Sequence, residues 1–150
     1  MNVIIVTGTP GTGKTKIAKK ISNEKKYIYL DVKSLIKKNK LGESYDRKRR
    51  TFVVDTKKLN KILIYDYIVP LKLDKKINGV VIDSHLSHHL PKKYVDLCIV
   101  TKCDLKELKK RLDKRSYSKA KVRENLDCEI FDICLNEARE AGHKMQIIKT

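Results

Sequence analysis

The sequence predicts an α/β fold built on a doubly wound parallel sheet of five strands flanked by helices. Short apolar runs rich in β-branched residues recur along the chain, and segments with helical spacing of apolar residues lie between them. The first of these runs leads directly into a glycine-rich stretch. Continuous apolar runs are typical of parallel strands that are buried on both faces. Strands that alternate with helices build a sheet covered on both sides.

Each predicted strand is short and continuous. The five runs are Val3–Val6, Tyr27–Leu30, Val80–Ile82, Leu97–Val100 and Met145–Ile148. We expect all five to join a single sheet, because each is apolar throughout and needs cover on both faces.

Four segments between the strands have the spacing of helices. Their periodic apolar residues are Ile17, Ala18 and Ile21; Leu59, Ile62 and Leu63; Leu105, Leu108 and Leu112; and Val122, Leu126, Ile130 and Ile133. We predict that the second helix is capped by Asp55 or Thr56 and ends before Pro70. Asp104, with Glu107 three residues later, predicts a capping-box start for the third helix.

The size and charge of the chain suggest its class and its partners. Its 150 residues predict one domain over residues 1–150. Lys and Arg number 35 and Asp and Glu 18, which gives a formal net charge of +17. Such a charge attracts polyanions, so RNA, nucleotides or a ribosomal particle are expected partners, although abundant lysine is also typical of thermophile proteins. The few aromatic residues form no stacking pattern, which argues against sequence-specific RNA reading.

The absence of targeting signals and the pattern of cysteines predict a cytoplasmic location. No apolar run approaches the roughly 18 residues of a membrane span, and the N-terminus enters the strand-like run NVIIV without a signal peptide. The four cysteines have no CxxC pair and no zinc-ribbon spacing, so we expect reduced thiols that bind no metal; they are Cys98, Cys103, Cys128 and Cys134. We therefore expect a cytoplasmic protein without a membrane partner.

The octapeptide GTPGTGKT follows the first predicted strand and precedes the first predicted helix. It fits the phosphate-binding pattern GxxxxGK[ST] in full, and it stands in the structural context that this pattern needs. Gly8, Gly11 and Gly13 let the backbone N–H groups turn toward phosphate oxygens at the positive end of the helix. Lys14 is expected to reach the β- and γ-phosphates of ATP, and the Thr15 hydroxyl to bind Mg²⁺. The sequence thus predicts a P-loop NTPase.

An acid at the end of a neighbouring strand is the second element that such a site needs. The strand-like run VVID ends in Asp83, which we predict to hold the magnesium ion through water. His85 then lies near the γ-phosphate, where it orients a water or hydroxyl nucleophile or bonds a phosphate; a locally packed loop histidine is the alternative. We interpret His88 and His89 as solvated loop residues, because adjacent side chains diverge and Mg²⁺ prefers oxygen ligands.

A second motif, IVTKCD at residues 99–104, resembles the [NT]KxD guanine-reading element of small GTPases. Three observations oppose a GTPase switch. No glycine follows Asp83 in the D-x-x-G pattern that senses the γ-phosphate, no SAK-like element follows at a suitable place, and Asp104 already serves as a helix cap. We therefore treat the GTPase as the weaker alternative.

Three motifs together resemble one family, the small adenylate kinases of archaea and eukaryotic nuclei, which also serve as small-ribosomal-subunit assembly factors. TGTPGTGKT matches the phosphate loop, IDSH the D-x-H motif, and RLDKRSYSKAKVRENLDCEIF the segment through the lid. The resemblance covers nearly the whole chain. It implies an NMP-binding region at about residues 31–54 and a lid at about residues 114–124. The residues it implies for ATP are Gly11, Gly13, Lys14, Thr15 and Lys16 on the phosphates, and Arg115 from the lid.

Water must be excluded when a phosphoryl group passes between nucleotides, and a mobile lid with arginines does this. We predict that Arg111 and Arg115, four residues apart on one helical face, bind ATP and neutralise developing charge. A solvated helix charge is the alternative for both. The predicted catalytic set is then Lys14, Asp83, His85 and Arg115.

Two departures from the family pattern concern the nucleotide sites. Lys37 stands where the family's NMP region carries an arginine, and the later stretch is the basic RKRR, residues 47–50. Because lysine cannot make the bidentate phosphate fork, we expect broad NMP specificity. The sequence also ends just past the last predicted strand, so we expect part of the cover over the nucleotide base to be missing or the chain to be shortened.

The resemblance implies an adenylate kinase-type reaction in which ATP·Mg²⁺ and an NMP, with AMP favoured, give ADP and an NDP. It also implies ATPase activity and a role in small-subunit (16S rRNA) maturation. The implied partners are a platform ribosomal protein of the uS11 type and the 30S particle or its rRNA, with the chain a monomer or weak oligomer. The alternative is an ATPase assembly factor in which kinase turnover is incidental.

Overall fold

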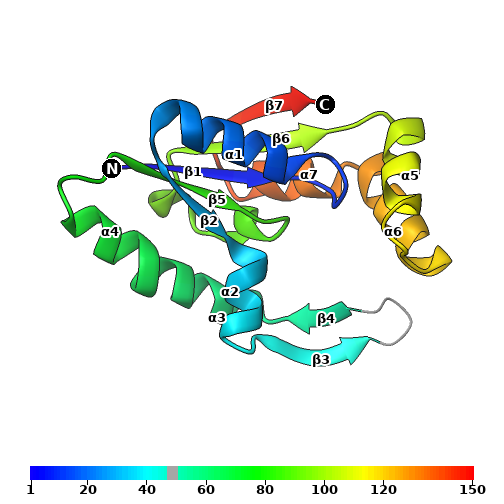
Figure 1. The fold of residues 1–150 in the computed structure, drawn as a ribbon, viewed down its shortest axis with the longest axis horizontal. Helices are drawn as coiled ribbons and strands as arrows, with labels where there is room; N and C mark the ends of the chain where they lie inside the picture. Colours follow the sequence, from blue (N-terminus) through cyan, green and yellow to red (C-terminus); the bar gives the residue numbers. More distant parts are fainter. Residues whose placement is uncertain (47–50) are drawn as a thin grey trace.

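The computed structural model describes residues 1–46 and 51–150, and its description of side chains excludes residues 42–53. Five strands form one parallel sheet in the order β2-β5-β1-β6-β7 (Figure 1). They are β1 (Asn2–Thr7), β2 (Ile28–Asp31), β5 (Gly79–Asp83), β6 (Leu97–Lys102) and β7 (Met145–Lys149). All five predicted strands and the doubly wound fold are confirmed.

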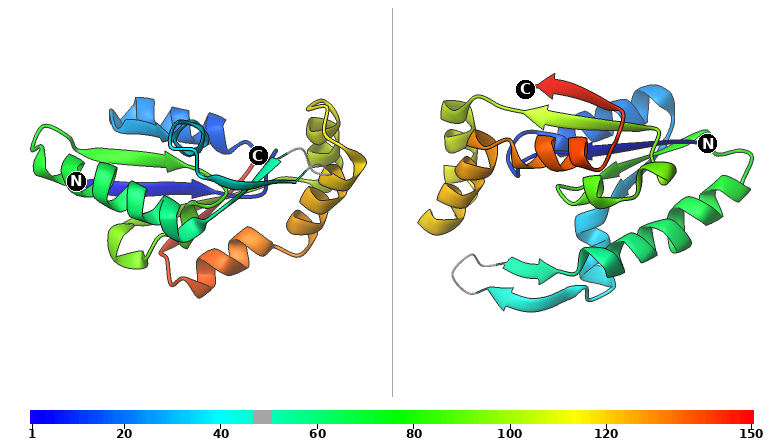
Figure 2. Two further views of the ribbon diagram at one scale, coloured as in Figure 1. Left: turned by 90° about the horizontal axis from the view of Figure 1, so that it is seen from below. Right: turned by 180° about the vertical axis from the view of Figure 1, so that it is seen from behind.

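Side chains of β1 alternate between the two faces of the sheet, as strand geometry requires. Ile4 and Val6 pack with Ala18 of α1 (Lys14–Lys25) on one face. Val3 and Ile5 belong to the larger cluster on the other face. Seen along the sheet in Figure 2, α1 lies on one side and α4 and α7 on the other. A central strand buried on both faces explains why its sequence is apolar throughout.

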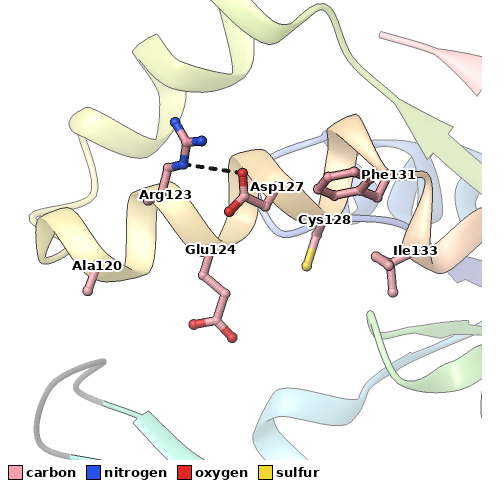
Figure 3. A pocket seen from close by; sticks show the side chains of 7 residues that line it. All are labelled: Ala120, Arg123, Glu124, Asp127, Cys128, Phe131 and Ile133. Atoms are coloured by element: carbon pink, nitrogen blue, oxygen red, sulfur yellow. Dashed lines mark ion pairs between the residues drawn. The ribbon is translucent and has the colours of Figure 1, made fainter.

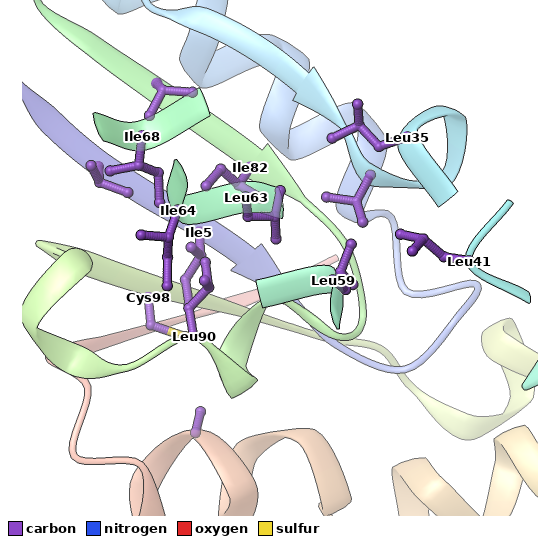
Figure 4. Packing of buried hydrophobic residues seen from close by; sticks show 14 of the residues in the cluster. Ile5, Leu35, Leu41, Leu59, Leu63, Ile64, Ile68, Ile82, Leu90 and Cys98 are labelled. Carbon is purple, nitrogen blue, oxygen red and sulfur yellow. The ribbon is translucent and has the colours of Figure 1, made fainter. Parts of the chain in front are cut away.

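One long helical segment packs into the larger core cluster beside residues of β1, β5 and β6. It consists of α3 (Thr56–Ile62), a π-helical stretch (Leu63–Ile68) and α4 (Val69–Leu73). Leu59, Leu63 and Ile68 are fully buried in this cluster (Figure 4). Burying each such side chain stabilises the fold by about 1.5–3 kcal/mol.

The predicted stop before Pro70 is wrong, because the helical segment runs on to Leu73. Asp55 caps its start, as predicted, by accepting hydrogen bonds from the N–H groups of Lys57 and Lys58. In a regular α-helix, proline removes one hydrogen bond and its ring collides with the preceding turn. Here the Val69 N–H donates to Ile64 O, five residues back, and this wider turn accommodates the ring in the first turn of α4.

The fourth predicted helix is in fact two helices, α6 (Lys119–Ile130) and α7 (Ile133–Glu140). Between them, Asp132 has φ 52° in the left-handed region, which ends one helix and redirects the next. Ile130 and Ile133 are therefore exposed, although their spacing predicted a shared buried face. The periodicity identified helical residues correctly but not the break.

Further elements lie within or next to the segments predicted for NMP binding and for the lid. The first contains α2 (Val32–Lys38) and an antiparallel hairpin of β3 (Gly42–Asp46) and β4 (Thr51–Val54). Of the second segment, residues 114–124, only the start of α6 is helical; α5 (Leu105–Asp113) precedes the segment and packs against α6 around a small core made of Cys103, Leu108, Leu112 and Val122. The basic stretch 47–50 lies outside the described residues. None of the described helices is long and apolar enough to cross a membrane.

Candidate active site

The phosphate loop joins β1 to α1 at the carboxyl edge of the sheet. Its glycines have positive φ, 148° at Gly8 and 95° at Gly11. A Cβ atom at Gly8 would lie 2.3 Å from Thr101 Oγ1, so only glycine fits there. Thr12 closes the turn from inside, because its hydroxyl donates to Thr9 O at 2.6 Å. The loop therefore has the curled backbone that the GTPGTGKT sequence predicted.

Lys14 begins α1 and turns back over the loop, where its ammonium donates to Thr9 O at 3.3 Å. Burial lowers the pKa of Lys14 to about 8, and the nearby Arg115 cation acts in the same direction. An ammonium that has lost this much hydration gains strongly from a phosphate anion. This position suits a side chain that binds phosphate.

Asp83 ends β5 beside the loop and is only 5% exposed. Its Oδ2 accepts two hydrogen bonds of 2.7 Å each, from the Thr15 hydroxyl and from the Tyr29 hydroxyl. Burial, followed by the bond to Asp83, raises the pKa of Tyr29, so Tyr29 remains a donor. Thr15 and Asp83 thus meet as predicted, while Tyr29 on β2 is a member of the site that the sequence analysis missed. Hydroxyl and carboxylate oxygens are the ligands that Mg²⁺ prefers, so this pair fits the ion.

His85 follows Asp83 on the loop that leaves β5. Its side chain is exposed to solvent, yet protein atoms surround it on several sides. This desolvation, together with the Lys14 cation, lowers the pKa of His85 to about 4. The imidazole is therefore neutral near pH 7 and able to accept a proton or a hydrogen bond.

The prediction that His88 and His89 are both solvated loop residues is wrong for His88, which is 2% exposed. Its Nδ1 lies 2.7 Å from Thr7 Oγ1, and its Nε2 lies 2.5 Å from Glu137 Oε2. The cause is the 3₁₀ turn Ser87–His89, which carries His88 beneath the end of β1 and leaves His89 at the surface.

The two lid arginines are placed differently from one another. Helix α5 ends at Asp113, so Arg115 lies beyond it and the prediction of one shared helical face is wrong. Arg111 donates to Gly11 O at 3.3 Å, which brings its guanidinium to the phosphate loop. Arg115 is exposed and contacts Tyr117, whose hydroxyl lies 3.4 Å from Nη1. Both arginines remain predictions as ATP-binding residues, as do Gly13 within the loop and the exposed Lys16 on α1.

The residues of the rival motif at 99–104 have structural partners. The Thr101 hydroxyl lies 2.7 Å from Thr12 Oγ1, and the Lys102 ammonium lies 2.9 Å from Glu129 Oε1. Asp104 accepts from the N–H groups of Lys106 and Glu107, as a helix cap does. The predicted capping box is incomplete, because the Glu107 carboxylate pairs with Arg111 at 3.3 Å instead of accepting from the Asp104 N–H.

Glu129 is a second member of the site that sequence reasoning missed. Its carboxylate is buried and accepts from the Thr9 hydroxyl at 3.1 Å, from Lys102 at 2.9 Å and from the Cys103 N–H at 2.8 Å. It therefore ties α6 to the phosphate loop and to the end of β6. Glu129 lies in the segment RLDKRSYSKAKVRENLDCEIF that carries the family resemblance, which could have identified it. The spacing of residues along a helix, however, does not show which distant residues a glutamate contacts.

Two hollows lie near these residues. One, of about 390 Å³, lies at the carboxyl end of β6 and is lined by Lys102, Asp104, Glu129 and Lys149 among others. Ligands of open parallel sheets bind at this edge. The other, of about 470 Å³, runs along α6 to the start of α7 (Figure 3). Arg123 and Asp127 form an ion pair at 3.2 Å in its lining.

Comparison with known proteins agrees with this geometry. A family model described as an AAA domain matches residues 4–132. The adenylate kinase isoenzyme 6 homolog of Caenorhabditis elegans is 34% identical over 92% of this chain and 72% of its own length. The putative adenylate kinase of Methanocaldococcus jannaschii is 35% identical over 91% of this chain and 71% of its own.

Solved structures show the same fold at low identity. A sugar kinase from Janibacter has a TM-score of 0.65 and 15% identity, covering 99% of this chain and 85% of that one. Deoxyadenosine kinase from M. mycoides has a TM-score of 0.54 and 17% identity, and the match covers 97% of this chain and 89% of that one. With the sequence relatives, the AAA-domain match and the P-loop geometry together, the chain belongs to the family of adenylate kinase isoenzyme 6 homologs.

Proposed function

We propose that the protein is a nucleoside monophosphate kinase that transfers the γ-phosphoryl group of ATP to an NMP, with AMP favoured. The observation that carries this proposal is the Asp83 carboxylate, which holds the Thr15 and Tyr29 hydroxyls at 2.7 Å beside the phosphate loop. The names of the relatives support it, since several are adenylate kinase homologs.

Each residue of the site has a separate role in the proposed phosphoryl transfer. The loop N–H groups bind the ATP phosphates, and Lys14 neutralises charge on the β- and γ-phosphates. Thr15 and Asp83 would hold Mg²⁺, Asp83 through water; the ion, when bound, withdraws charge from the phosphate oxygens. Tyr29 fixes the Asp83 carboxylate by its hydrogen bond. Arg115 would approach the phosphates when the lid closes, with Arg111 supporting the loop at Gly11.

The NMP would lie over the segment at residues 31–54. Within it, Lys37 is exposed on α2, and a lysine offers phosphate a point charge rather than a fork. We therefore propose broad choice among NMPs.

An ATPase activity is part of the proposal, because His85 offers a neutral imidazole near Lys14. Such a group orients an attacking water. The alternative, an ATPase assembly factor in which kinase turnover is incidental, depends on this same residue. A role in small-subunit maturation, with a platform ribosomal protein, the 30S particle or its rRNA as partner, is supported by the net charge of +17 and by the family resemblance.

One experiment tests the kinase against the alternative. ATP consumption is measured with and without each NMP, and ADP and NDP are followed separately. A kinase forms one NDP from the NMP for each ATP consumed, and ATP loss without NMP is much slower. Equal ATP loss with and without every NMP, and no NDP derived from the NMP, contradicts the kinase and favours the ATPase.

A further inference from the structure

A group of metal-ligand side chains lies apart from the P-loop. His88 and His89 belong to the 3₁₀ turn after β5, and Glu137 projects from α7. One donor atom from each of the three lies within 4.8 Å of the others. The phosphoryl-transfer mechanism uses none of them.

Two imidazoles converge on one carboxylate oxygen. His88 Nε2 lies 2.5 Å and His89 Nε2 lies 3.5 Å from the same Glu137 Oε2. Solvent reaches the outer side of the group, because the His89 side chain is 36% exposed and that of Glu137 is 41% exposed. The inner side is closed, since His88 is 2% exposed.

The inner ring nitrogen of His88, Nδ1, is hydrogen-bonded to Thr7. His88 Nδ1 lies 2.7 Å from Thr7 Oγ1, and the Thr7 hydroxyl also points at His85 O at 3.4 Å. Thr7 has one proton to donate. A nitrogen and a carboxylate oxygen 2.5 Å apart share a proton, so without a metal His88 Nε2–H donates to Glu137 Oε2 and the Thr7 hydroxyl donates to Nδ1. A cation on Nε2 would take the place of that proton; the ring proton would then lie on Nδ1 and be donated to Thr7 Oγ1, while the Thr7 hydroxyl donates to His85 O. In metal-bound histidines, a hydrogen bond from the other ring nitrogen fixes the orientation of the ring in the same way.

We propose that His88, His89 and Glu137 form a binding site for a divalent transition-metal ion of the zinc type. Imidazole nitrogen and carboxylate oxygen suit Zn²⁺, and three protein ligands leave a fourth position for water on the exposed side. Ligand atoms of a tetrahedral zinc site stand about 3.3 Å apart, given bonds of about 2.05 Å. The separation of His89 Nε2 from Glu137 Oε2 already matches. The separation of His88 Nε2 has to open by about 0.8 Å, which rotation of the half-exposed Glu137 side chain supplies.

A bound ion would join two parts of the fold that are distant in sequence. It fixes the loop after β5 to α7, and through His88 it fixes Thr7, the residue directly before the P-loop glycine Gly8. The His88 carbonyl is already held by His143 Nε2 at 2.9 Å. The site is therefore a clamp behind the phosphate loop rather than a part of the reaction.

The test measures metal binding directly. Tag-free, metal-stripped protein is titrated with Zn²⁺ against a chromophoric chelator in excess Mg²⁺, which occupies the oxygen ligands at Thr15 and Asp83. Co²⁺ replaces Zn²⁺ in a parallel titration, because its visible spectrum reports tetrahedral geometry and any thiolate ligand. We expect one equivalent to bind, with a tetrahedral Co²⁺ spectrum free of thiolate bands.

Three variants locate the binding. His89→Gln and Glu137→Gln change side chains that are partly exposed, so both are expected to fold. Each should weaken Zn²⁺ binding by more than the about 10–100-fold that loss of a second-shell partner costs. Glu140→Gln makes the same chemical change at an exposed position one turn along α7 and should leave the affinity unchanged. Wild-type protein that binds no equivalent of either metal overturns the proposal. Affinity that survives in both ligand variants, falls equally in Glu140→Gln, or vanishes on thiol alkylation also overturns it.

Discussion

The phosphate loop and the lid are built in different ways. The loop joins strand β1, whose residues Val3 to Val6 are almost fully buried, and its side chains bond to Asp83, Thr101 and Glu129 on other elements. The predicted lid lies between α5 and α6, which share a small core of their own, and its Arg115 is exposed beyond the end of α5. The loop is thus held by contacts with several elements, including Glu129 of α6 and Arg111 of α5, whereas Arg115 lies in an exposed turn between those two helices.

This difference fits what each region has to do. Groups that bind the transferred phosphoryl must be held in position before the reaction. Groups that exclude water must move to admit the nucleotides. Glu129 connects the two regions, because it stands on α6 and bonds to the Thr9 hydroxyl of the loop. Substitutions in the loop should therefore act on turnover, and substitutions in the lid on stability or closure.

The largest effect is expected from Lys14→Ala, which removes the cation from the fixed region. Kinase and ATPase turnover should both be abolished, since the Lys14 cation no longer neutralises charge on the β- and γ-phosphates. The thermal unfolding curve should change little, because Lys14 contacts only the loop backbone at Thr9 in its direct hydrogen bond. Lys20→Ala, an exposed position on the same helix, serves as the control and should keep wild-type rates. Retention of more than a tenth of wild-type turnover by Lys14→Ala would place the active site elsewhere.

The second prediction distinguishes reactions in which water is the nucleophile from those in which the NMP phosphate is. His85→Ala should slow ATP hydrolysis more than NMP phosphorylation, by a factor within the range of about 10²–10⁴ for a positioned acid–base group. In hydrolysis a water must be oriented, whereas an NMP phosphate oxygen is already held by its own site. Both rates are measured in one preparation at saturating magnesium. Asp83→Asn is the comparison variant, because both reactions should fall together and the Mg²⁺ requirement should rise. Equal losses in His85→Ala would instead assign the histidine to the metal or the loop.

The third prediction tests the connection between the two regions. Glu129→Gln replaces one acceptor oxygen by an amide and removes the charge that pairs with Lys102, so unfolding free energy should fall by about 2–3 kcal/mol. Asp132→Asn alters the other carboxylate on Lys102, which is 45% exposed, and should cost under about 1 kcal/mol. Denaturant unfolding of both variants measures the difference. If the two losses were equal, Glu129 would be no more than a surface partner of Lys102.

Sequence patterns predicted the parts of the molecule whose causes are local. The five strands follow from runs of β-branched residues, and the phosphate loop follows from glycine spacing between a strand and a helix. Asp83 followed from its place at a strand end. These features depend on residues within a few positions of one another, so a single sequence contains their signal.

The remaining features depend on partners that are far away in the chain. Glu129 meets Thr9 across 120 residues, and His88 meets Thr7 across 81. Tyr29 joins the site because β2 pairs with β5, which places its strand beside Asp83. Pro70 continues a helix because a π-helical turn precedes it. In each case a tertiary contact or an unusual turn outweighs the local preference that the pattern expresses.

The smallest effect is expected at the start of α5, the helix before the predicted lid. Asp104→Ala removes the cap that accepts from Lys106 and Glu107, and should lower the unfolding free energy by about 1 kcal/mol. Asp55→Ala is a matched control, because Asp55 caps α3 in the same way through Lys57 and Lys58. Similar losses are expected, but amide exchange should rise in the first turn of α5 for one variant and of α3 for the other.

Asp104→Ala also tests the guanine-reading interpretation of residues 99–104. A carboxylate that serves only as a cap has no contact with the base, so the preference for ATP over GTP should be the same in Asp104→Ala, Asp55→Ala and the wild type. Nucleotide competition measures that preference. A change in GTP binding confined to Asp104→Ala would mean that the carboxylate reads a base at the hollow beside β6. The start of α5, which leads to the predicted lid, would then contact the nucleotide, and the division between a fixed loop and a mobile lid would not hold at that point.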